Sequence, residues 1–187
     1  PQVSLGQPIP INIDNGVAAM AVAQLSGCTA EEIRRGMATF AGVDRRFDFK
    51  VRTPRHVLLS DYAHHPKEIY QSARSLRELY KDRKITVIFQ PHLYTRTRDF
   101  APEFARALSL CDRVVLLDIY PAREEPIPGV TSEIILKDIT APEKVLIHAD
   151  ELVDWVRGHE VDVLVTFGAG NIDRLVEPIA SVLKERI

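Results

Sequence analysis

The first forty residues carry the hydrophobic pattern of two consecutive helices. From Asn15, apolar and small residues recur at the spacing of one helix face: Val17, Met20, Ala21 and Leu25. Gly27 is expected to end this helix. Thr29 and Glu32 then form a capping-box pattern, in which each side chain satisfies an orphan backbone donor. A second amphipathic stretch follows and is predicted to end at Gly42.

Beyond Gly42 the pattern changes to short apolar runs that alternate with helical stretches. The apolar runs are rich in Val, Ile and Leu, as is typical of strands buried on both faces, and span residues 57–59, 85–89, 114–117, 145–147 and 163–167. The helical patterns span residues 66–80, 101–108, 132–139, 150–157 and 172–184. Pro178 predicts a kink or a late start of the last helix. The alternation predicts an α/β fold, with a Rossmann-like, mostly parallel sheet and helices on both faces.

The change of pattern places a domain boundary between Gly42 and Lys50. We therefore expect a helical segment over residues 1–44 and an α/β domain over residues 45–187. The length of 187 residues agrees, because it suits one domain, or one domain and a piece of another.

Composition narrows the class of protein. Hydrophobic residues make up 45% and charged residues 27% of the chain, which excludes a disordered chain, a collagen-like repeat and a disulfide scaffold. The net charge of -2 lacks the basic excess of a general nucleic-acid binder. No apolar run reaches the roughly 18 residues of a membrane span. Residues 1–6 lack signal-peptide features and an initiator Met, so the chain is interpreted as entered midway.

The two cysteines, Cys28 and Cys111, lie far apart in sequence beside apolar residues. This usage predicts a reduced, cytoplasmic protein with two buried thiols rather than a secreted disulfide protein.

Residues capable of chemistry follow four of the predicted strands. They lie at positions 60–66, 90–98, 118–125 and 168–171. Ligands of an open parallel sheet bind beyond the carboxyl ends of the strands. We therefore expect these four segments to share one edge of the sheet and to form the functional site.

The first of these segments contains Asp61 and the run His64-His65-Pro66. Asp61 can accept two hydroxyl hydrogen bonds, as a ribose would need, or it can be a cap or a solvated carboxylate. The proline suits the first turn of a helix, so one histidine can serve merely as a cap. A metal site lacks a third ligand at a set spacing.

The second segment contains His92, Arg96 and Arg98. An arginine fork can pair with a carboxylate or phosphate, and a nearby histidine can exchange protons near neutral pH. The alternative is a solvated basic loop.

Two further motifs are less specific. Gly168-Ala169-Gly170 can hold an anion at a helix N-terminus or form a plain tight turn, and Asp173 stands where the dinucleotide fingerprint needs a glycine. Near the N-terminus, Asn15 can be an N-cap. No G-x-x-x-x-G-K-[ST] loop is present, so an ATP-using protein would hold its main phosphate cradle outside this chain.

Together these motifs resemble the Mur ligases of peptidoglycan synthesis. The matching stretches are residues 12–15, 42–47, 61–66, 90–98 and 168–172, in order along nearly the whole chain. The pair D-Y-x-H-H-P and Q-P-H-x-x-T-R-T-R resembles the branch of the family that adds L-alanine, together with the related ligase that recycles murein peptides.

The resemblance implies an architecture and a reaction. Residues 1–44 would be the helical end of a central ATP-binding domain, and residues 45–187 the complete C-terminal Rossmann-like domain. ATP would phosphorylate the carboxylate of UDP-N-acetylmuramate, and the amine of L-alanine would attack the acyl phosphate. The main Mg and phosphate sites would lie upstream, so the isolated chain is predicted to be inactive.

The resemblance also implies roles for individual residues. Asn12 and Asn15 would lie on the adenine side, and Asp61 beside the ribose or the hinge. Arg46 would reach the terminal phosphate of ATP and, with His92, would be catalytic. The alanine pocket would consist of Tyr62, His64, His92 and Arg96.

This chain departs from the family pattern at two positions. Leu93 stands where many relatives have Arg, and Ile11 where a histidine often precedes the first asparagine. Two other hypotheses stay open: the peptide-recycling ligase, which would need a larger pocket near His92, and a nucleotide-binding module without catalysis.

Overall fold

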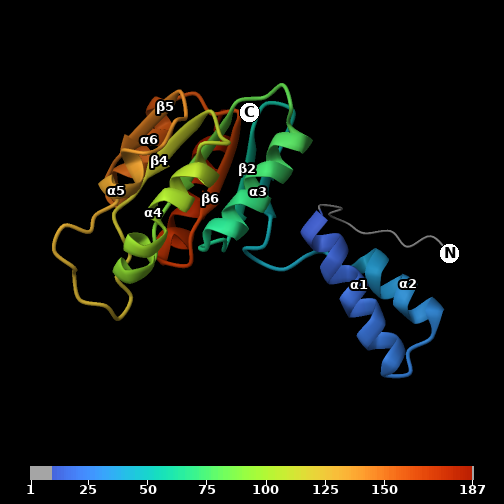
Figure 1. Ribbon diagram of the computed structural model, residues 1–187. Coiled ribbons are helices and arrows are strands. Elements are labelled where there is room, and N and C mark those ends of the chain that lie inside the picture. Colours follow the sequence, from blue (N-terminus) through green and yellow to red (C-terminus); the bar gives the residue numbers. More distant parts are fainter. Residues whose placement is uncertain (1–9, 187) are drawn as a thin grey trace. The chain divides into compact units, whose positions relative to one another are not determined.

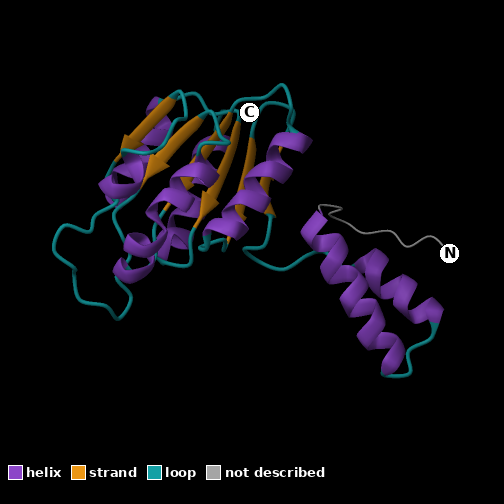
Figure 2. Ribbon diagram, viewed as in Figure 1, coloured by secondary structure: helices purple, strands orange, loops and turns teal. Residues whose placement is uncertain are grey.

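The computed structural model describes residues 10–186 (Figures 1 and 2), so the expectation for residues 1–6 lies outside the described part of the chain. Contacts between Cα atoms divide the chain into two compact units, Pro1–Asp44 and Arg45–Ile187. Each unit is described by itself.

The first unit holds a helical hairpin of α1 (Pro10–Leu25) and α2 (Ala30–Thr39). The predicted capping box is confirmed: the N–H of Glu32 donates to Thr29 Oγ1 over 3.3 Å, and the N–H of Thr29 donates to Glu32 Oε2 over 2.8 Å. Gly27 lies between the helices at φ +89°, which suits glycine. The second helix ends at Thr39, three residues before the predicted Gly42.

One expectation for this hairpin is wrong. Asn15 is not an N-cap, because α1 begins five residues earlier, at Pro10. Proline at the first helical position costs no hydrogen bond, since that backbone donor would be unpaired anyway.

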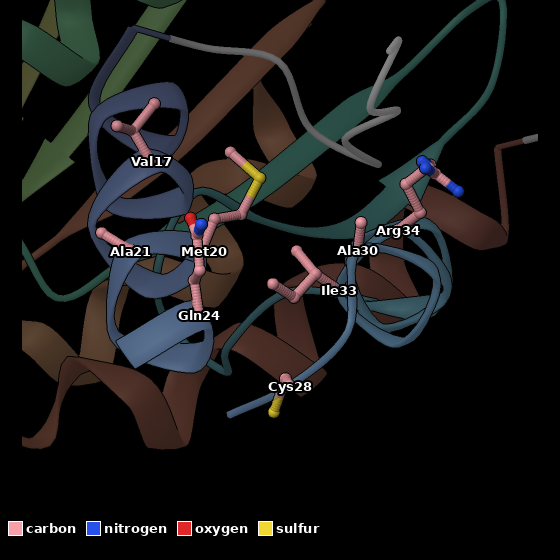
Figure 3. Close-up of a pocket in the computed structure, with 8 residues that line it drawn as sticks. All are labelled: Val17, Met20, Ala21, Gln24, Cys28, Ala30, Ile33 and Arg34. Atoms are coloured by element: carbon pink, nitrogen blue, oxygen red, sulfur yellow. The ribbon is translucent and has the colours of Figure 1, made fainter. Parts of the chain in front are cut away.

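A cavity of about 470 Å³ lies between α1 and α2 (Figure 3), with Met20 and Ile33 among its lining residues. Several apolar side chains of the hairpin are exposed: Val17, which also lines the cavity, is 57% exposed, Val22 64% and Leu25 89%. The hairpin therefore carries more apolar surface than its two helices cover.

The second unit is built on a six-stranded sheet in the order β1-β2-β6-β3-β4-β5, which confirms the predicted Rossmann-like α/β class. The strands are β1 (Asp48–Arg52), β2 (Val57–Asp61), β3 (Ile85–Phe89), β4 (Arg113–Leu116), β5 (Glu143–Leu146) and β6 (Val163–Phe167). All neighbouring strands are parallel except β1, which pairs antiparallel with β2.

Helices cover both faces of this sheet, as predicted. The α-helices are α3 (Pro66–Leu79), α4 (Tyr94–Leu108), α5 (Glu133–Leu136), α6 (Leu152–Gly158) and α7 (Val176–Lys184). Two 3₁₀ turns, η1 (Ala149–Glu151) and η2 (Asn171–Leu175), precede α6 and α7. Pro178 is the third residue of α7, so the last helix has the late start that was one of the two expected outcomes.

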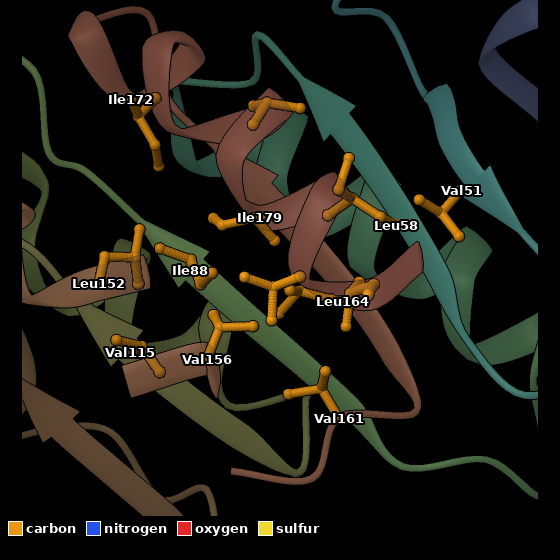
Figure 4. Packing of buried hydrophobic residues seen from close by; sticks show 14 of the residues in the cluster. Val51, Leu58, Ile88, Val115, Leu152, Val156, Val161, Leu164, Ile172 and Ile179 are labelled. Atoms are coloured by element: carbon orange, nitrogen blue, oxygen red, sulfur yellow. The ribbon is translucent and has the colours of Figure 1, made fainter. Parts of the chain in front are cut away.

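The core fills both sides of the sheet. On one face, Leu58, Ile88 and Leu164 of the strands pack with Leu152 of α6 and Ile179 of α7 (Figure 4), and all five are fully buried. Burying each such side chain contributes about 1.5–3 kcal/mol. On the other face, Phe89 contacts Phe104 of α4 at a ring separation of 5.1 Å.

The structure corrects three predictions of secondary structure: one missed strand, one helix start and one helix length. Strand β1 was not predicted, because its sequence alternates charged and apolar residues at the sheet edge. Helix α4 begins at Tyr94 rather than at residue 101, and a kink at Phe100 separates the two parts. The helix predicted over residues 132–139 is a single turn, α5.

The prediction of two buried thiols holds only for Cys111. Cys28 is free and exposed, and Cys111 is free and buried. Among the helices of residues 10–186, none combines the length and the apolar character that crossing a bilayer requires.

Candidate functional site

The carboxyl ends of β2, β6, β3 and β4 are neighbours in the sheet, so the segments that follow them meet at one edge. A row of rings crosses this edge. The ring centroids of Tyr62 and His64 are 5.1 Å apart, those of His64 and His92 6.2 Å, and those of His92 and Tyr120 5.7 Å. Three of these residues were predicted to share a pocket, and the structure brings them together. Tyr120 belongs to the segment 118–125 that was expected at this edge, but it was not named as a site residue.

His92 lies in an environment that favours its neutral form. Burial, the charge of Arg96 and the neighbouring His64 lower the pKa of His92 below its usual value, and Glu124 opposes the shift. The Nδ1 atom of His92 is buried and has no hydrogen-bond partner within residues 10–186.

Arg96 is the second unsatisfied group of this site. It lies in the first turn of α4 and is half-buried. Its Nη1 atom is buried without a partner among the described residues. Buried polar atoms nearly always have partners, so Arg96 and His92 together mark a place where a polar group would be favourably bound. Arg98 differs, since it is exposed and pairs with Asp99 over 2.7 Å.

The adjacent histidines have separate roles. Nδ1 of His65 accepts a hydrogen bond from the N–H of Lys67 over 3.3 Å and caps α3, so the capping alternative is confirmed for this residue. Nδ1 of His64 lies 3.0 Å from the carbonyl oxygen of Tyr62. Burial opposes ionisation of Glu68, but hydrogen bonds from the N–H groups of His64 and His65 keep its pKa below the usual value.

Asp61 lies at the end of β2 with both carboxylate oxygens engaged. Oδ2 accepts from the Ser72 hydroxyl over 2.6 Å, and Oδ1 accepts from the N–H of Ala63 over 3.0 Å. Burial raises the pKa of Asp61, although the two hydrogen bonds and the charge of Arg46 oppose this shift. These contacts are those of neither a helix cap, since His65 caps α3, nor a solvated carboxylate. The predicted ribose role of Asp61 stays a prediction.

The adjacent arginines at the start of this unit differ in their surroundings. Arg45 donates to the carbonyl oxygen of Gly168 over 2.8 Å and lies 4.7 Å above the ring of Tyr62. Arg46 is exposed, and its charge reaches Asp61. The Nε atom of Arg45 is buried without a hydrogen-bond partner among the described residues. Of these two arginines, Arg46 is the one with an exposed side chain.

The glycines after β6 allow close backbone approach. A Cβ atom at Gly168 would lie 3.0 Å from the carbonyl oxygen of Gln90. A Cβ atom at Gly170 would lie 2.5 Å from Gln90 Oε1 and 2.7 Å from Cγ of Tyr120. The tight-turn interpretation of this motif accounts for both glycines without an anion.

Asn12 and Asn15 belong to the other unit and lie inside α1, where Asn15 is exposed. Their predicted contact with adenine stays a prediction. Within residues 10–186, no group of three or more His, Cys, Asp or Glu side chains is arranged to hold a metal ion.

The fold and this edge define a Rossmann-like α/β domain in which Arg96 and His92, each with an unsatisfied buried nitrogen, lie where parallel strands end. The family model described as "Mur ligase, glutamate ligase domain" matches residues 45–170. The chain belongs to the Mur ligase family.

Individual relatives agree with this assignment. The chain is 58% identical over 187 residues to the UDP-N-acetylmuramate–L-alanine ligase of Parabacteroides distasonis and 43% identical over 184 residues to that of Flavobacterium psychrophilum. The two matches cover 100% and 98% of this chain, but only 40% and 41% of the respective relatives, so the chain spans less than half of their length. The crystal structure of the UDP-N-acetylmuramate–alanine ligase of Thermotoga maritima superposes with a TM-score of 0.79 at 26% identity, over 99% of this chain and 40% of that one.

A murein peptide ligase from Psychrobacter arcticus shares the fold. Its TM-score is 0.67 at 19% identity, over 97% of this chain and 38% of that one.

Proposed function

We propose that this chain supplies the amino-acid-binding part of an ATP-dependent ligase that joins L-alanine to UDP-N-acetylmuramate in peptidoglycan synthesis. The observation that carries the proposal is the unpaired, half-buried guanidinium of Arg96 beside the neutral imidazole of His92. The names of the relatives support the choice of substrates. An enzyme that uses these nucleotides would work in the cytoplasm.

The two unsatisfied groups match the two ends of an amino acid. The guanidinium of Arg96 can donate charge-assisted hydrogen bonds to the carboxylate of L-alanine. The amine must lose a proton before it attacks, and neutral His92 is able to accept one. Tyr62 and His64 complete the pocket on the side of β2.

The reaction follows from the chemistry of an acyl phosphate. Transfer of the terminal phosphoryl group of ATP to the carboxylate of UDP-N-acetylmuramate forms the acyl phosphate and releases ADP. The amine of L-alanine then forms the C–N bond, and the C–O bond to phosphate breaks. Arg46 would stabilise charge on the phosphoryl group, because its exposed guanidinium lies at the same edge as the amino-acid pocket. Asp61, Asn12 and Asn15 would lie on the nucleoside side.

Magnesium and the triphosphate are assigned to sites outside this chain. The sequence has no phosphate loop, and residues 10–186 hold no metal-binding cluster.

Residues 1–44 are proposed to be the end of the ATP-binding domain, and residues 45–187 the C-terminal domain. The exposed apolar side chains of the hairpin support this division. Val17, Val22 and Leu25 are all more than half exposed, as expected for a surface that packs against further chain.

The test uses a chimera that carries these 187 residues in place of the matching segment of the Parabacteroides distasonis relative. We expect ADP release that requires both L-alanine and UDP-N-acetylmuramate. The isolated chain should show no turnover, and ligation by the isolated chain would contradict its assignment as one part of the enzyme. A folded chimera that accepts an L-alanyl peptide but not L-alanine would favour the recycling ligase. One that binds ATP and ligates nothing would favour a non-catalytic module.

Three variants of the chimera test the roles of the arginines. Arg96→Ala should raise the KM for L-alanine, whereas Arg98→Ala, on the same turn but paired with Asp99, should leave it unchanged. Arg46→Ala should lower kcat by about 100-fold or more, the typical effect of losing one group that stabilises transition-state charge. Equal KM values for the Arg96 and Arg98 variants would contradict the carboxylate role of Arg96.

A further inference from the structure

The loop that joins β4 to α5, residues 117–132, is held in place at two points. At its base, the hydroxyl of Ser132 donates to the carbonyl oxygen of Leu117 over 2.6 Å, and Ser132 is only 2% exposed. Further along, Glu124 accepts from the N–H of Thr95 over 2.9 Å and from its hydroxyl over 2.5 Å. Loops of this length in compact domains are commonly functional. This one is tied to the first turn of α4, the turn that carries Arg96.

The backbone of this loop extends the pairing of β3 and β4 beyond the two strands. The N–H of Tyr120 donates to the carbonyl oxygen of Pro91 over 2.8 Å, and its carbonyl oxygen accepts from the N–H of Leu93 over 3.0 Å. These two bonds make a parallel bridge between Tyr120 and His92. The Tyr120 ring lies over the imidazole at 5.7 Å between centroids and 26° between planes. Stacking over one face of the imidazole restricts the rotamers that His92 can adopt.

The Tyr120 ring in turn depends on the absence of a side chain at position 170. A Cβ atom on Gly170 would lie 2.7 Å from Cγ and 2.8 Å from Cβ of Tyr120. Neither distance is tolerated, and neither contact atom is the end of a flexible side chain. Gly170 follows β6, Tyr120 follows β4 and His92 follows β3, so three strand ends interlock around one imidazole.

We propose that Tyr120 is a positioning residue for His92 in the amino-acid site, and that Gly170 is required because it admits the Tyr120 ring. This inference rests on the proposed function. Tyr120 acts by holding the imidazole in one orientation and by keeping water from it. Both effects act on His92 and leave the nucleotide side of the site unchanged.

The kinetic test compares four variants of the chimera. Tyr120→Leu should lower kcat/KM for L-alanine by about 10-fold to 100-fold, the range that small misplacements in an active site produce, with the KM for ATP unchanged. Tyr120→Phe retains the stacked ring and should behave as the parent. Gly170→Ala disturbs the same contact from the other side, and its Cβ would also lie 2.5 Å from Gln90 Oε1. It should reproduce the effect of Tyr120→Leu on kcat/KM for L-alanine. Tyr70→Leu is the matched control, because Tyr70 is 43% exposed on α3.

A second readout uses the 187-residue chain itself and does not depend on ligation. NMR titration of the His92 imidazole should show an upward shift of its pKa in Tyr120→Leu and in Gly170→Ala, because water reaches the ring. Tyr120→Phe should leave the titration unchanged. A merely structural role for Tyr120 would lower stability without this shift.

The outcomes separate the two proposals. A chimera with no activity on L-alanine, together with the expected shift of the His92 titration, would overturn the proposed function. It would not overturn the inference that Tyr120 and Gly170 position His92. An active chimera in which Tyr120→Leu and Gly170→Ala keep the parental kcat/KM for L-alanine and the parental His92 titration would overturn the inference. If Tyr120→Leu does not fold, Gly170→Ala and Tyr120→Phe decide the question by the same two measurements.

Discussion

Gln90 offers a sharp test of how the strand ends are held together. Its side chain is only 4% exposed and bridges β3 to the turn that follows β6. Oε1 accepts from the N–H of Ile172 over 3.1 Å, and Nε2 donates to Asn171 Oδ1 over 2.9 Å. Gln90→Ala removes both hydrogen bonds and leaves the N–H of Ile172, a residue 2% exposed, without an acceptor.

The expected loss of stability can be estimated from three contributions. An orphaned buried N–H costs about 1–3 kcal/mol. The bond to exposed Asn171 contributes about 0.5–1 kcal/mol, and the lost methylene about 0.8 kcal/mol. We therefore expect Gln90→Ala to lower the free energy of unfolding by about 3 kcal/mol. For a chain of this size, that corresponds to a fall in Tm of roughly 6–12 °C.

The assay is urea denaturation followed by tryptophan fluorescence. The chain has one tryptophan, Trp155 in α6, which reports on the same unit. Gln71→Ala is the matched control, because Gln71 is exposed on α3. Gln90→Met keeps most of the volume and loses both hydrogen bonds, so it should retain most of the destabilisation. A Gln90→Ala chain within about 0.5 kcal/mol of Gln71→Ala, the range of ordinary surface substitutions, would refute the reasoning.

Three further predictions concern the titration of His92, the reactivity of the two cysteines and the adjacent arginines Arg45 and Arg46. Burial lowers the pKa of His92, so the unfolded chain binds more protons than the native chain below about pH 6.5. The free energy of unfolding should therefore decrease as the pH is lowered below that value. In urea titrations, His92→Gln should show a smaller decrease. Iodoacetamide should label Cys28 in the native chain but Cys111 only after unfolding, because burial raises the pKa of Cys111 to about 12; mass spectrometry showing two native labels would contradict this. Arg45→Ala should lower the Tm, since its hydrogen bond to a backbone carbonyl contributes about 1.5–3 kcal/mol, whereas Arg46→Ala should leave it unchanged.

The sequence predicted the strands where burial on both faces left an uninterrupted apolar run. All five residues of β3 and of β6 are buried, and both runs were predicted with their correct bounds. Strand β1 could not be found in this way, because an edge strand alternates polar and apolar residues. The early start of α4 was missed for a different reason. Tyr94 to Arg98 is a polar motif without a helical apolar period, and its helical form depends on contacts with the loop after β4, such as those of Thr95 with Glu124.

The position of strand ends and the family motifs predicted which segments form the candidate site, but not the contacts between their side chains. The rule that strand ends share an edge gathered His64, His92 and Arg96 in one place. It placed the segments of Tyr120 and Gln90 at this edge but assigned neither residue a role, because their roles arise from distances between residues far apart in sequence. Tyr120 and Gly170, for example, are separated by fifty positions and by two strands in the chain. A glycine that excludes a side chain carries no chemical signal until its neighbour is known.

Backbone strain marks the same site without reference to any relative. Within the described part of the chain, four residues other than glycine have φ in the left-handed region: Arg45 at +61°, Phe47 at +49°, Leu93 at +73° and Ala122 at +54°. Such conformations cost on the order of 1–3 kcal/mol each and persist only where surrounding contacts hold them. Two belong to the segment that places Arg45 over Tyr62, Leu93 is next to His92, and Ala122 lies in the loop that brings Tyr120 to the imidazole. The strain is therefore concentrated in the three segments that orient the ring row, as expected of a site whose geometry is maintained at the expense of stability.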